Sequence, residues 1–233
     1  MSGFLQIAEY NLAMQNFGNY FILLTAKGKE IPLQLIAKAI LDNKPDYIDE
    51  VIGTQVEICL KLNSSFSNQK LRELETIKLG NRNKISTYKL PVFFSEEADW
   101  KTIERHCGLT RTEYITQLLA SKISLAMLGF LPGFLYLTGL PDTLMVPRKD
   151  TPSKRVDPGS IAIGNKYMGL YSLASPGGWH IIGRTPIKIF DVQQLPLNDI
   201  KVGDEIKMVE ITQQTYIAMK NTPLNLKEYN EFM

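Results

Sequence analysis

Short apolar runs, each bounded by glycine or proline, fill the second half of the chain. The runs are LAMLGF (125–130), SIAIG (160–164), GLYSLA (169–174), WHIIG (179–183) and IKIFDV (187–192). Several of them alternate or carry β-branched side chains, which is typical of strands joined by turns. EIKMVEIT (205–212) and TYIAMK (215–220) continue the strand pattern toward the C-terminus. The pattern predicts a mainly β domain, a barrel or a sandwich with functional loops.

The first 80 residues have a different pattern. It predicts a strand at 19–26, a helix at 31–41, a strand pair or one long strand at 49–62, and a second helix at 71–79. This strand–helix–strand–helix order favours a small α+β domain. Polar residues around Gly80 interrupt the pattern, so we expect domains at 1–85 and 86–233. The predicted fold class is an α+β N-terminal domain followed by a mainly β domain.

Two helices are predicted near the start of the second domain, as a hairpin at 96–121. Gly108 stands where a C-terminal cap of the first helix would fall. Thr110 and Glu113 have the spacing of a capping box, in which each residue bonds the other's backbone N–H. We expect this hairpin to pack on the β domain.

Composition and charge argue against nucleic acid as a partner. Hydrophobic residues make up 44% of the chain and charged residues 21%, with a formal net charge of only +2. A phosphate-binding surface usually carries a clear basic excess. The two predicted helices resemble a helix-turn-helix, but the second one has only Arg111 and Lys122 as bases. The helical hairpin without a DNA-binding role is the better interpretation.

The sequence predicts a soluble, cytoplasmic protein. Cys59 and Cys107 lie far apart and outside any CxxC motif, which fits a reducing compartment. The N-terminus lacks the charge and cleavage pattern of a signal peptide. Residues 123–141 carry no charge, but their glycines and prolines argue against a membrane-spanning helix. We therefore expect no membrane association.

Three loops contain the residues best suited to chemistry. They are GFLPGF (129–134), SPGGW (175–179) and GRTP (183–186). Consecutive glycines allow close backbone approach, so Gly177 and Gly178 can direct N–H groups at an anion or a carbonyl oxygen. Arg148 and Arg184 add planar, permanently charged groups for a carboxylate or phosphate. Together the loops predict a pocket for a small-molecule substrate, lined by Phe130, Phe134, Tyr136 and Trp179 beside the two arginines.

Other kinds of site have less support. The chain has two histidines, His106 and His180, and no spacing of His, Cys and Asp that fits a metal site. Ser175 and His180 are near in sequence, and a role of His180 as a general base stays open. No P-loop and no GxGxxG motif occurs, so any nucleotide site is of another kind.

The motifs resemble one known family. GFLPGFLYLTGLP (129–141), PR (147–148), PGSIAIG (158–164), SPGGWHIIGRTP (175–186) and IFD (189–191) are similar to the B subunit of 5-oxoprolinase. That family is related to allophanate hydrolase subunit 1, to bacterial histidine-kinase inhibitors and to a module of urea carboxylases. The resemblance is strong over about residues 90 to 210.

This resemblance implies a cyclophilin-like barrel and an enzyme complex. Its partners would be the A and C subunits of that enzyme, the latter homologous to this chain, and together they cleave 5-oxo-L-proline to L-glutamate with ATP. Carried over onto matching positions, the expected catalytic residues are Arg148 and Arg184. The expected substrate-binding residues are Phe130, Pro132, Gly133, Phe134, Ser175, Pro176, Gly177, Gly178, Trp179 and Thr185.

The sequence departs from the family pattern at four positions. Leu118 stands where the family usually has a histidine, Ser153 where it has an arginine, and Tyr167 and Met168 where it has glutamine and threonine. If these residues line the pocket, they make it more apolar. Two alternatives therefore stay open: a regulatory protein that binds a sensor histidine kinase, and a subunit of a related amide or urea-type hydrolase.

Overall fold

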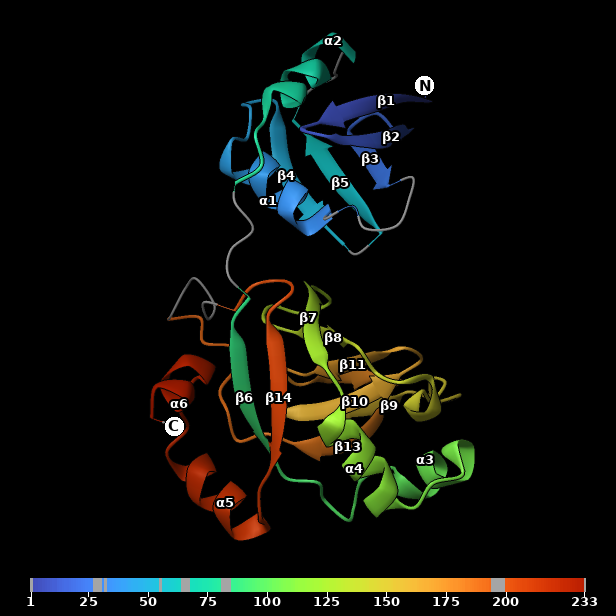
Figure 1. Cartoon of the computed structure of the whole chain (residues 1–233), viewed down its shortest axis with the longest axis vertical. Helices are drawn as coiled ribbons and strands as arrows, with labels where there is room; N and C mark the ends of the chain where they lie inside the picture. The colour runs from blue at the N-terminus through green and yellow to red at the C-terminus, as the bar shows by residue number, and fades with distance from the viewer. Residues whose placement is uncertain are drawn as a thin grey trace. The chain divides into compact units, whose positions relative to one another are not determined.

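The computed structural model describes residues 2–26, 31, 33–54, 56–63, 68–80, 85–193 and 200–232. The chain divides into two compact units, residues 1–84 and 85–233 (Figure 1). Each unit has its own hydrophobic core.

The N-terminal unit is an antiparallel sheet with a helix on one face. Its elements are β1 (Ser2–Ile7), β2 (Tyr10–Phe17), β3 (Phe21–Ala26), α1 (Leu33–Asp42), β4 (Ile48–Gly53), β5 (Glu57–Leu62), α2 (Asn68–Leu71) and a 3-10 turn (Arg72–Thr76). The strand order is β1-β2-β3-β5-β4. Alternate residues of β5, Ile58, Leu60 and Leu62, are buried, and they share a core with Ile36 and Ile40 of α1. Period-two strands and a period-3.6 helix thus bury their apolar faces against each other.

Three strands precede the first helix, which corrects the predicted strand–helix–strand–helix order. The predicted elements begin at residue 19 and omit the hairpin of β1 and β2. The predicted strand at 19–26, the helix at 31–41 and the strand pair within 49–62 are confirmed by β3, α1, β4 and β5. The predicted helix at 71–79 is wrong, because α2 ends at Leu71 and only a 3-10 turn follows.

The second unit is built on a curled sheet of seven strands. Its strands are β6 (Thr87–Val92), β7 (Ile123–Leu128), β8 (Leu135–Thr138), β10 (Ser160–Gly164), β11 (Tyr167–Leu170), β13 (His180–Arg184) and β14 (Glu205–Glu210). Their order is β13-β10-β11-β8-β7-β14-β6, with β14 and β6 parallel. The two edges meet where Phe93 and Arg184 exchange backbone hydrogen bonds of 2.8 and 2.9 Å. The sheet therefore forms a half-barrel joined at one point of its seam.

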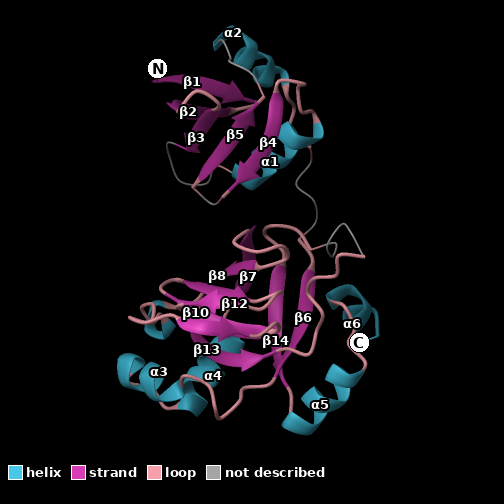
Figure 2. Cartoon of the chain, turned by 180° about the vertical axis from the view of Figure 1, so that it is seen from behind, coloured by secondary structure: helices cyan, strands magenta, loops and turns pink. Residues whose placement is uncertain are grey.

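The two faces of this sheet contribute side chains to different hydrophobic cores. On β10, Ile161 and Ile163 belong to the main core, whereas Ala162 belongs to a smaller aromatic cluster. On β8, Leu135 and Leu137 belong to the main core, and Tyr136 packs against the aromatic cluster. Because successive strand residues point to opposite faces, the two cores lie on opposite sides of the sheet. A two-stranded sheet of β9 (Ser153–Val156) and β12 (Ser175–Gly177) contributes Val156 to the aromatic cluster. Figure 2 shows β10, β12 and β13 from the opposite side to Figure 1.

Helices flank the half-barrel at two places. α3 (Trp100–Cys107) and α4 (Arg111–Ala120) form the predicted helical pair. The capping box is confirmed, with Thr110 accepting from the Glu113 N–H and Glu113 from the Thr110 N–H, and Gly108 takes the left-handed cap conformation. α5 (Gln213–Asn221) and α6 (Leu226–Phe232) follow β14, and Figure 1 shows them beside β6.

Two predicted strands near the C-terminus are wrong. TYIAMK lies within α5, because the Thr212 hydroxyl accepts from the Thr215 N–H and starts a helix that buries none of its residues. A segment of six residues without a fully buried side chain gives no reliable period by which strand and helix can be distinguished. IKIFDV makes only an isolated bridge from Lys188 to Asn225. The predicted fold class, an α+β unit followed by a mainly β barrel-like unit, is confirmed.

Candidate functional site

The aromatic cluster is the centre of the candidate site, and we call the side of the sheet on which it lies, opposite the main core, the outer face. Phe134 is 2% exposed and Trp179 is 6% exposed. The Phe134 ring lies 4.8 Å from the Tyr136 ring, 5.0 Å from Tyr171 and 6.1 Å from Trp179, each edge to face. Such pairs stabilise beyond the area that they bury. The cluster is a closely packed wall. Phe134 and Trp179 are buried in it, so they support the residues around a site and expose little surface to a ligand.

Two glycines let the large rings lie directly on the sheet. A Cβ added at Gly164 would lie 2.6 Å from the Trp179 indole. A Cβ added at Gly169 would lie 2.5 Å from Phe134 and 2.8 Å from Trp179. Real Cβ atoms do not approach other atoms this closely, so the wall requires glycine at both positions.

Arg148 lies at one end of this wall. Its guanidinium carbon is 5.8 Å from the centre of the Trp179 ring, a cation–π distance, and the residue is exposed. The next residue, Lys149, donates its backbone N–H to the Gly178 carbonyl at 2.7 Å. The structure therefore brings together Arg148, Trp179 and the Gly177–Gly178 segment, which the sequence placed in one pocket.

The GFLPGF loop covers another part of the wall. Phe130 is 59% exposed, and its ring lies edge to face on Phe134 at 5.3 Å. Its φ of 68° is in the left-handed region, which is uncommon for a large residue other than glycine. The Ser172 hydroxyl donates to the Pro132 carbonyl at 2.6 Å, and Gly133 has a φ of 76°. The loop thus holds an aromatic ring at the surface in a strained conformation.

The SPGGW loop is partly a strand. Ser175, Pro176 and Gly177 form β12, in which Ser175 pairs with Val156 of β9. Gly177 lies against the Tyr171 hydroxyl, which an added Cβ would approach too closely for any other residue. The Ser175 Oγ is buried and has no hydrogen-bond partner among the described residues.

Arg184 ends β13 and Thr185 follows it, at the other end of this strand from Trp179. Arg184 pairs with Ser160, the first residue of β10, whereas Gly164, which lies against Trp179, is the last. Four residues of a strand span about 13 Å, so the two ends of β10 are that far apart. Thr185 is buried; its N–H donates to the Gly159 carbonyl, and its hydroxyl accepts from the Ile187 N–H. Thr185 is thus occupied in holding a turn, whereas the Arg184 side chain makes no hydrogen bond or ion pair within the described ranges.

The four departures from the family pattern do not share one pocket. Leu118 and Met168 are buried in the main core, on the opposite side of the sheet from the aromatic cluster. Tyr167 packs against the cluster, with its ring 6.2 Å from Tyr136, and the Ser153 hydroxyl accepts from the Lys149 ammonium at 3.3 Å. The expectation that all four make one pocket more apolar is therefore wrong for Leu118 and Met168.

His180 is a buried histidine at the start of β13. Burial lowers the pKa of its imidazole below the ordinary value, and the Lys149 and His106 charges act in the same direction. Asp99 and a hydrogen bond with the Pro147 backbone oppose this shift, and Nδ1 has no partner among the described residues. On β13, His180 pairs with Ile163, a main-core residue, so it lies on the opposite face from Trp179. A role as general base at the aromatic wall has no geometric support.

The lowered pKa of His180 predicts that acid destabilises the fold. The unfolded chain binds the proton more readily, so the contribution of His180 is fully present above its ordinary pKa, about 6.5, and is lost as the pH falls below it. We expect the free energy of unfolding to fall from about pH 7.5 to about pH 5.5, and to fall less in His180→Gln. Urea unfolding at several pH values measures this, with His106→Gln for comparison. An unchanged slope in His180→Gln would contradict the expectation.

The strained backbone at Phe130 predicts a difference between two small replacements. Phe130→Ala and Phe130→Gly both remove the ring, but only glycine adopts a positive φ without strain. We expect Phe130→Gly to be more stable than Phe130→Ala by about 1 kcal/mol. Denaturant midpoints with equal slopes would show this, and equal midpoints would mean that the loop relaxes when the ring is removed.

Sequence reasoning missed Asp99 and Lys149, which lie beside the predicted residues. The Lys149 ammonium is 2.7 Å from the Asp99 carboxylate. Asp99 lies far from the three loops in sequence, and no motif marks it. Within the described part of the chain, no cluster of three His, Cys, Asp or Glu residues is suited to a metal ion, and no helix is long and apolar enough to cross a membrane.

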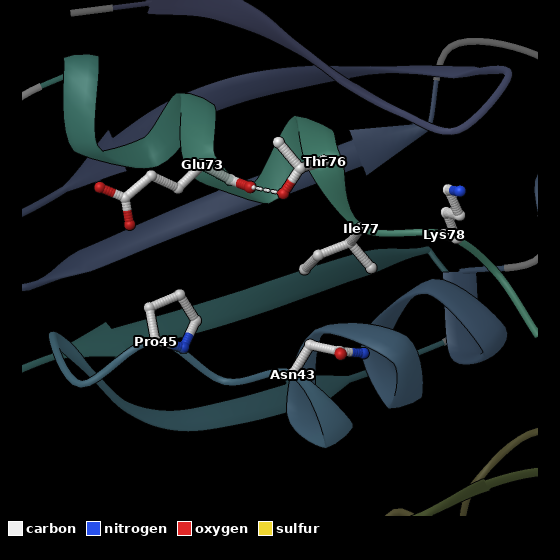
Figure 3. Close-up of a pocket in the computed structure, with 6 residues that line it drawn as sticks. All are labelled: Asn43, Pro45, Glu73, Thr76, Ile77 and Lys78. Carbon is white, nitrogen blue, oxygen red and sulfur yellow. Dashed lines mark hydrogen bonds between the residues drawn. The ribbon is translucent and has the colours of Figure 1, made fainter.

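The N-terminal unit has a hollow of about 450 Å³ beside the end of α1 (Figure 3). It is lined by Asn43, Pro45, Glu73, Thr76, Ile77 and Lys78. The Thr76 hydroxyl donates to the Glu73 carbonyl at 2.7 Å, and Figure 3 shows the Glu73 and Lys78 side chains at opposite ends. The charged groups do not converge, so the hollow has no evident ligand chemistry.

Comparisons with known sequences identify relatives. The model of the carboxyltransferase domain, subdomain C and D, matches residues 28–198. The B subunit of 5-oxoprolinase from Bacillus subtilis is 33% identical over 134 residues, which cover 57% of this chain and 56% of the relative. That of Haemophilus influenzae is 41% identical over 101 residues, 43% of this chain and 47% of the relative. The chain therefore matches about half the length of these curated relatives.

Solved structures show the same architecture. A conserved uncharacterized protein from Pyrococcus horikoshii is 27% identical, with a TM-score of 0.54, over 87% of this chain and 99% of that one. The urea carboxylase of Kluyveromyces lactis is 19% identical, with a TM-score of 0.68, over 97% of this chain and 24% of that one, and shows the fold alone. The resemblance inferred from the three loops is confirmed, and since the family model spans most of the residues, this chain belongs to the carboxyltransferase domain family, subdomain C and D.

Proposed function

We propose that this protein is a cytoplasmic subunit of an ATP-dependent 5-oxoprolinase-type enzyme, which converts 5-oxo-L-proline to L-glutamate. Its partners in the complex would be the A subunit and the homologous C subunit of that enzyme. The matches to the B subunit of 5-oxoprolinase support this assignment. The observation that carries it is the Arg148 guanidinium, which lies over Trp179 beside the Gly177–Gly178 segment.

The chemistry of the proposed reaction needs such a group. A lactam amide is a poor electrophile, and ATP activates it by transferring the γ-phosphoryl group to the lactam oxygen as ADP leaves. Water then adds to the carbon, and the ring nitrogen takes up a proton as the C–N bond breaks, which leaves an acyl phosphate. A second water hydrolyses the acyl phosphate to the carboxylate of glutamate and free phosphate. Phosphoryl transfer and the additions of water develop negative charge, which fixed cations and backbone N–H groups stabilise.

The residues of the outer face divide these tasks. Arg148 would bind the carboxylate or the phosphate through its planar fork, and Trp179 would hold the guanidinium flat. Gly177 and Gly178 would offer backbone N–H groups to an oxygen atom. Arg184, at the other end of β13 from Trp179, would bind a second anionic group.

The test is 5-oxoproline-dependent release of ADP and glutamate by the assembled complex. The protein is co-produced with its two partner subunits, and assembly is checked by size-exclusion chromatography. We expect release that is lost when this protein is omitted. An assembled complex without release would contradict the proposal and favour a binding role, such as inhibition of a sensor histidine kinase.

A further inference from the structure

The segment that carries Arg148 is attached to the fold through its neighbour Lys149. The Lys149 N–H donates to the Gly178 carbonyl at 2.7 Å. Its ammonium lies 2.7 Å from the Asp99 carboxylate and 3.3 Å from the Ser153 hydroxyl. Both ends of this one residue are therefore fixed, directly next to the Arg148 Cα.

Asp99 is itself held in place. It precedes α3, and its backbone N–H donates to the Ile181 carbonyl at 3.0 Å. Its carboxylate accepts the Ile181 N–H at 2.7 Å, through the same oxygen that faces Lys149. The ion pair thus ties the Arg148 segment to α3 and to β13 together.

This pair differs from the other ion pairs of the unit. The side chains of Lys149 and Asp99 are 17% and 30% exposed, whereas those of Lys188 and Asp191 are 50% and 20% exposed. Partly buried charges with further hydrogen bonds are screened less than surface pairs, which contribute little to stability. Lys188 and Asp191 provide a comparison pair, 2.6 Å apart, and the Lys188 backbone N–H donates to the Leu224 carbonyl in the segment before α6.

We infer that Lys149 and Asp99 are positioning residues, which fix the Arg148 guanidinium over Trp179. The inference rests on the proposed function for its catalytic consequence, because Arg148 is the group that would touch substrate. Without the ion pair, the exposed Arg148 side chain keeps its contact with the Trp179 ring and its attraction to the Tyr136 and Tyr171 hydroxyl groups, but the backbone beside it loses an anchor. A long side chain on a loosened segment samples many rotamers, so the guanidinium would be in place for a smaller fraction of the time.

The first experiment measures position and not activity. In the full chain, the Trp179 indole N–H resonance reports on the guanidinium beside it, and Trp100→Phe assigns which of the two tryptophan signals is which. We expect Arg148→Met and Lys149→Met each to shift this resonance. When Arg148 is already methionine, Lys149→Met should cause little further shift. Lys149→Arg restores the wild-type position, and Lys188→Met leaves it unchanged.

The second experiment measures turnover of the assembled complex. We expect Lys149→Met to lower kcat/KM by about 10-fold to 100-fold. Lys149→Arg should recover most of this loss, and the thermal midpoint of each variant shows that the fold persists. A merely structural role would move the thermal midpoint but leave kcat/KM of the folded enzyme unchanged.

The outcomes separate this inference from the proposed function. If the wild-type complex does not turn over 5-oxoproline, the function fails while the resonance measurement still decides the positioning. If the complex is active and Lys149→Met keeps both the resonance and kcat/KM, the inference is overturned and the function stands. If Lys149→Met shifts the Trp179 resonance as much in the Arg148→Met protein as in the wild type, Lys149 does not act through Arg148 and the inference is overturned.

Discussion

Arg148→Ala lowers turnover of the assembled complex by on the order of 100-fold to 1,000-fold, the usual effect of removing one donor that stabilises a transition state. Arg148 is exposed, and its side chain interacts with the face of Trp179 and with Tyr136 and Tyr171 but forms no ion pair among the described residues, so the fold loses little when it is removed. The measurement is kcat and KM for 5-oxoproline and for ATP, together with the thermal midpoint. A lower kcat at unchanged stability is the expected result.

Two further variants make this result specific. Arg155→Ala removes another arginine close in sequence, one whose side chain is 72% exposed and paired with Asp157 at 3.0 Å, and it should leave turnover unchanged. Arg148→Lys keeps the charge but loses the planar fork, so we expect only partial activity. Full turnover in Arg148→Ala would remove this residue from the mechanism.

The same assay defines what Arg184 does. Its backbone closes the seam of the half-barrel with Phe93, and this contact survives replacement of the side chain. We propose that its guanidinium binds a second anionic group, at the opposite end of β10 from Trp179. If the two arginines bind different groups, their losses of transition-state free energy add in the double variant, whereas one shared group would make them non-additive.

The sequence marked residues that the structure brings together, but it did not mark the residues that support them. Glycine, proline and aromatic residues mark loops such as SPGGW because those residue types are needed for close backbone approach, and the structure does bring Trp179 and Arg148 together. Asp99 reaches the same place only through the fold, and a single carboxylate has no pattern around it. Leu118 was misplaced because spacing along the chain does not tell which face of a curled sheet a residue meets.

The same limit applies to the secondary structure. Elements with a buried periodic face, such as α1 and β5, were predicted because burial imposes their period. α5 buries no residue, so the apolar residues of its sequence need not follow a helical period, and the helix could not be identified from their spacing. Its start depends on the Thr212 cap, which becomes informative only when the following residues are known to be helical.

The stability of the outer face depends on the two glycines beneath the rings. At Gly169, a methyl group would lie 2.5 Å from Phe134 and 2.8 Å from Trp179, and both rings are buried with little room to move. We expect Gly169→Ala and Gly164→Ala each to lower the free energy of unfolding by about 1–3 kcal/mol, the usual cost of overpacking a well-filled core. Denaturant unfolding of the full chain, followed by tryptophan fluorescence, measures the change.

A third glycine tests whether the effect comes from the rings or from the loss of any glycine. At Gly129, an added Cβ would meet only Tyr136, at the ordinary contact distance of 3.9 Å, and its φ is not in the left-handed region. Gly129→Ala should therefore be neutral or slightly stabilising, because alanine restricts the unfolded chain. If Gly169→Ala is as stable as Gly129→Ala, then Phe134 and Trp179 can move apart, and the wall that supports Arg148 is softer than its packing implies.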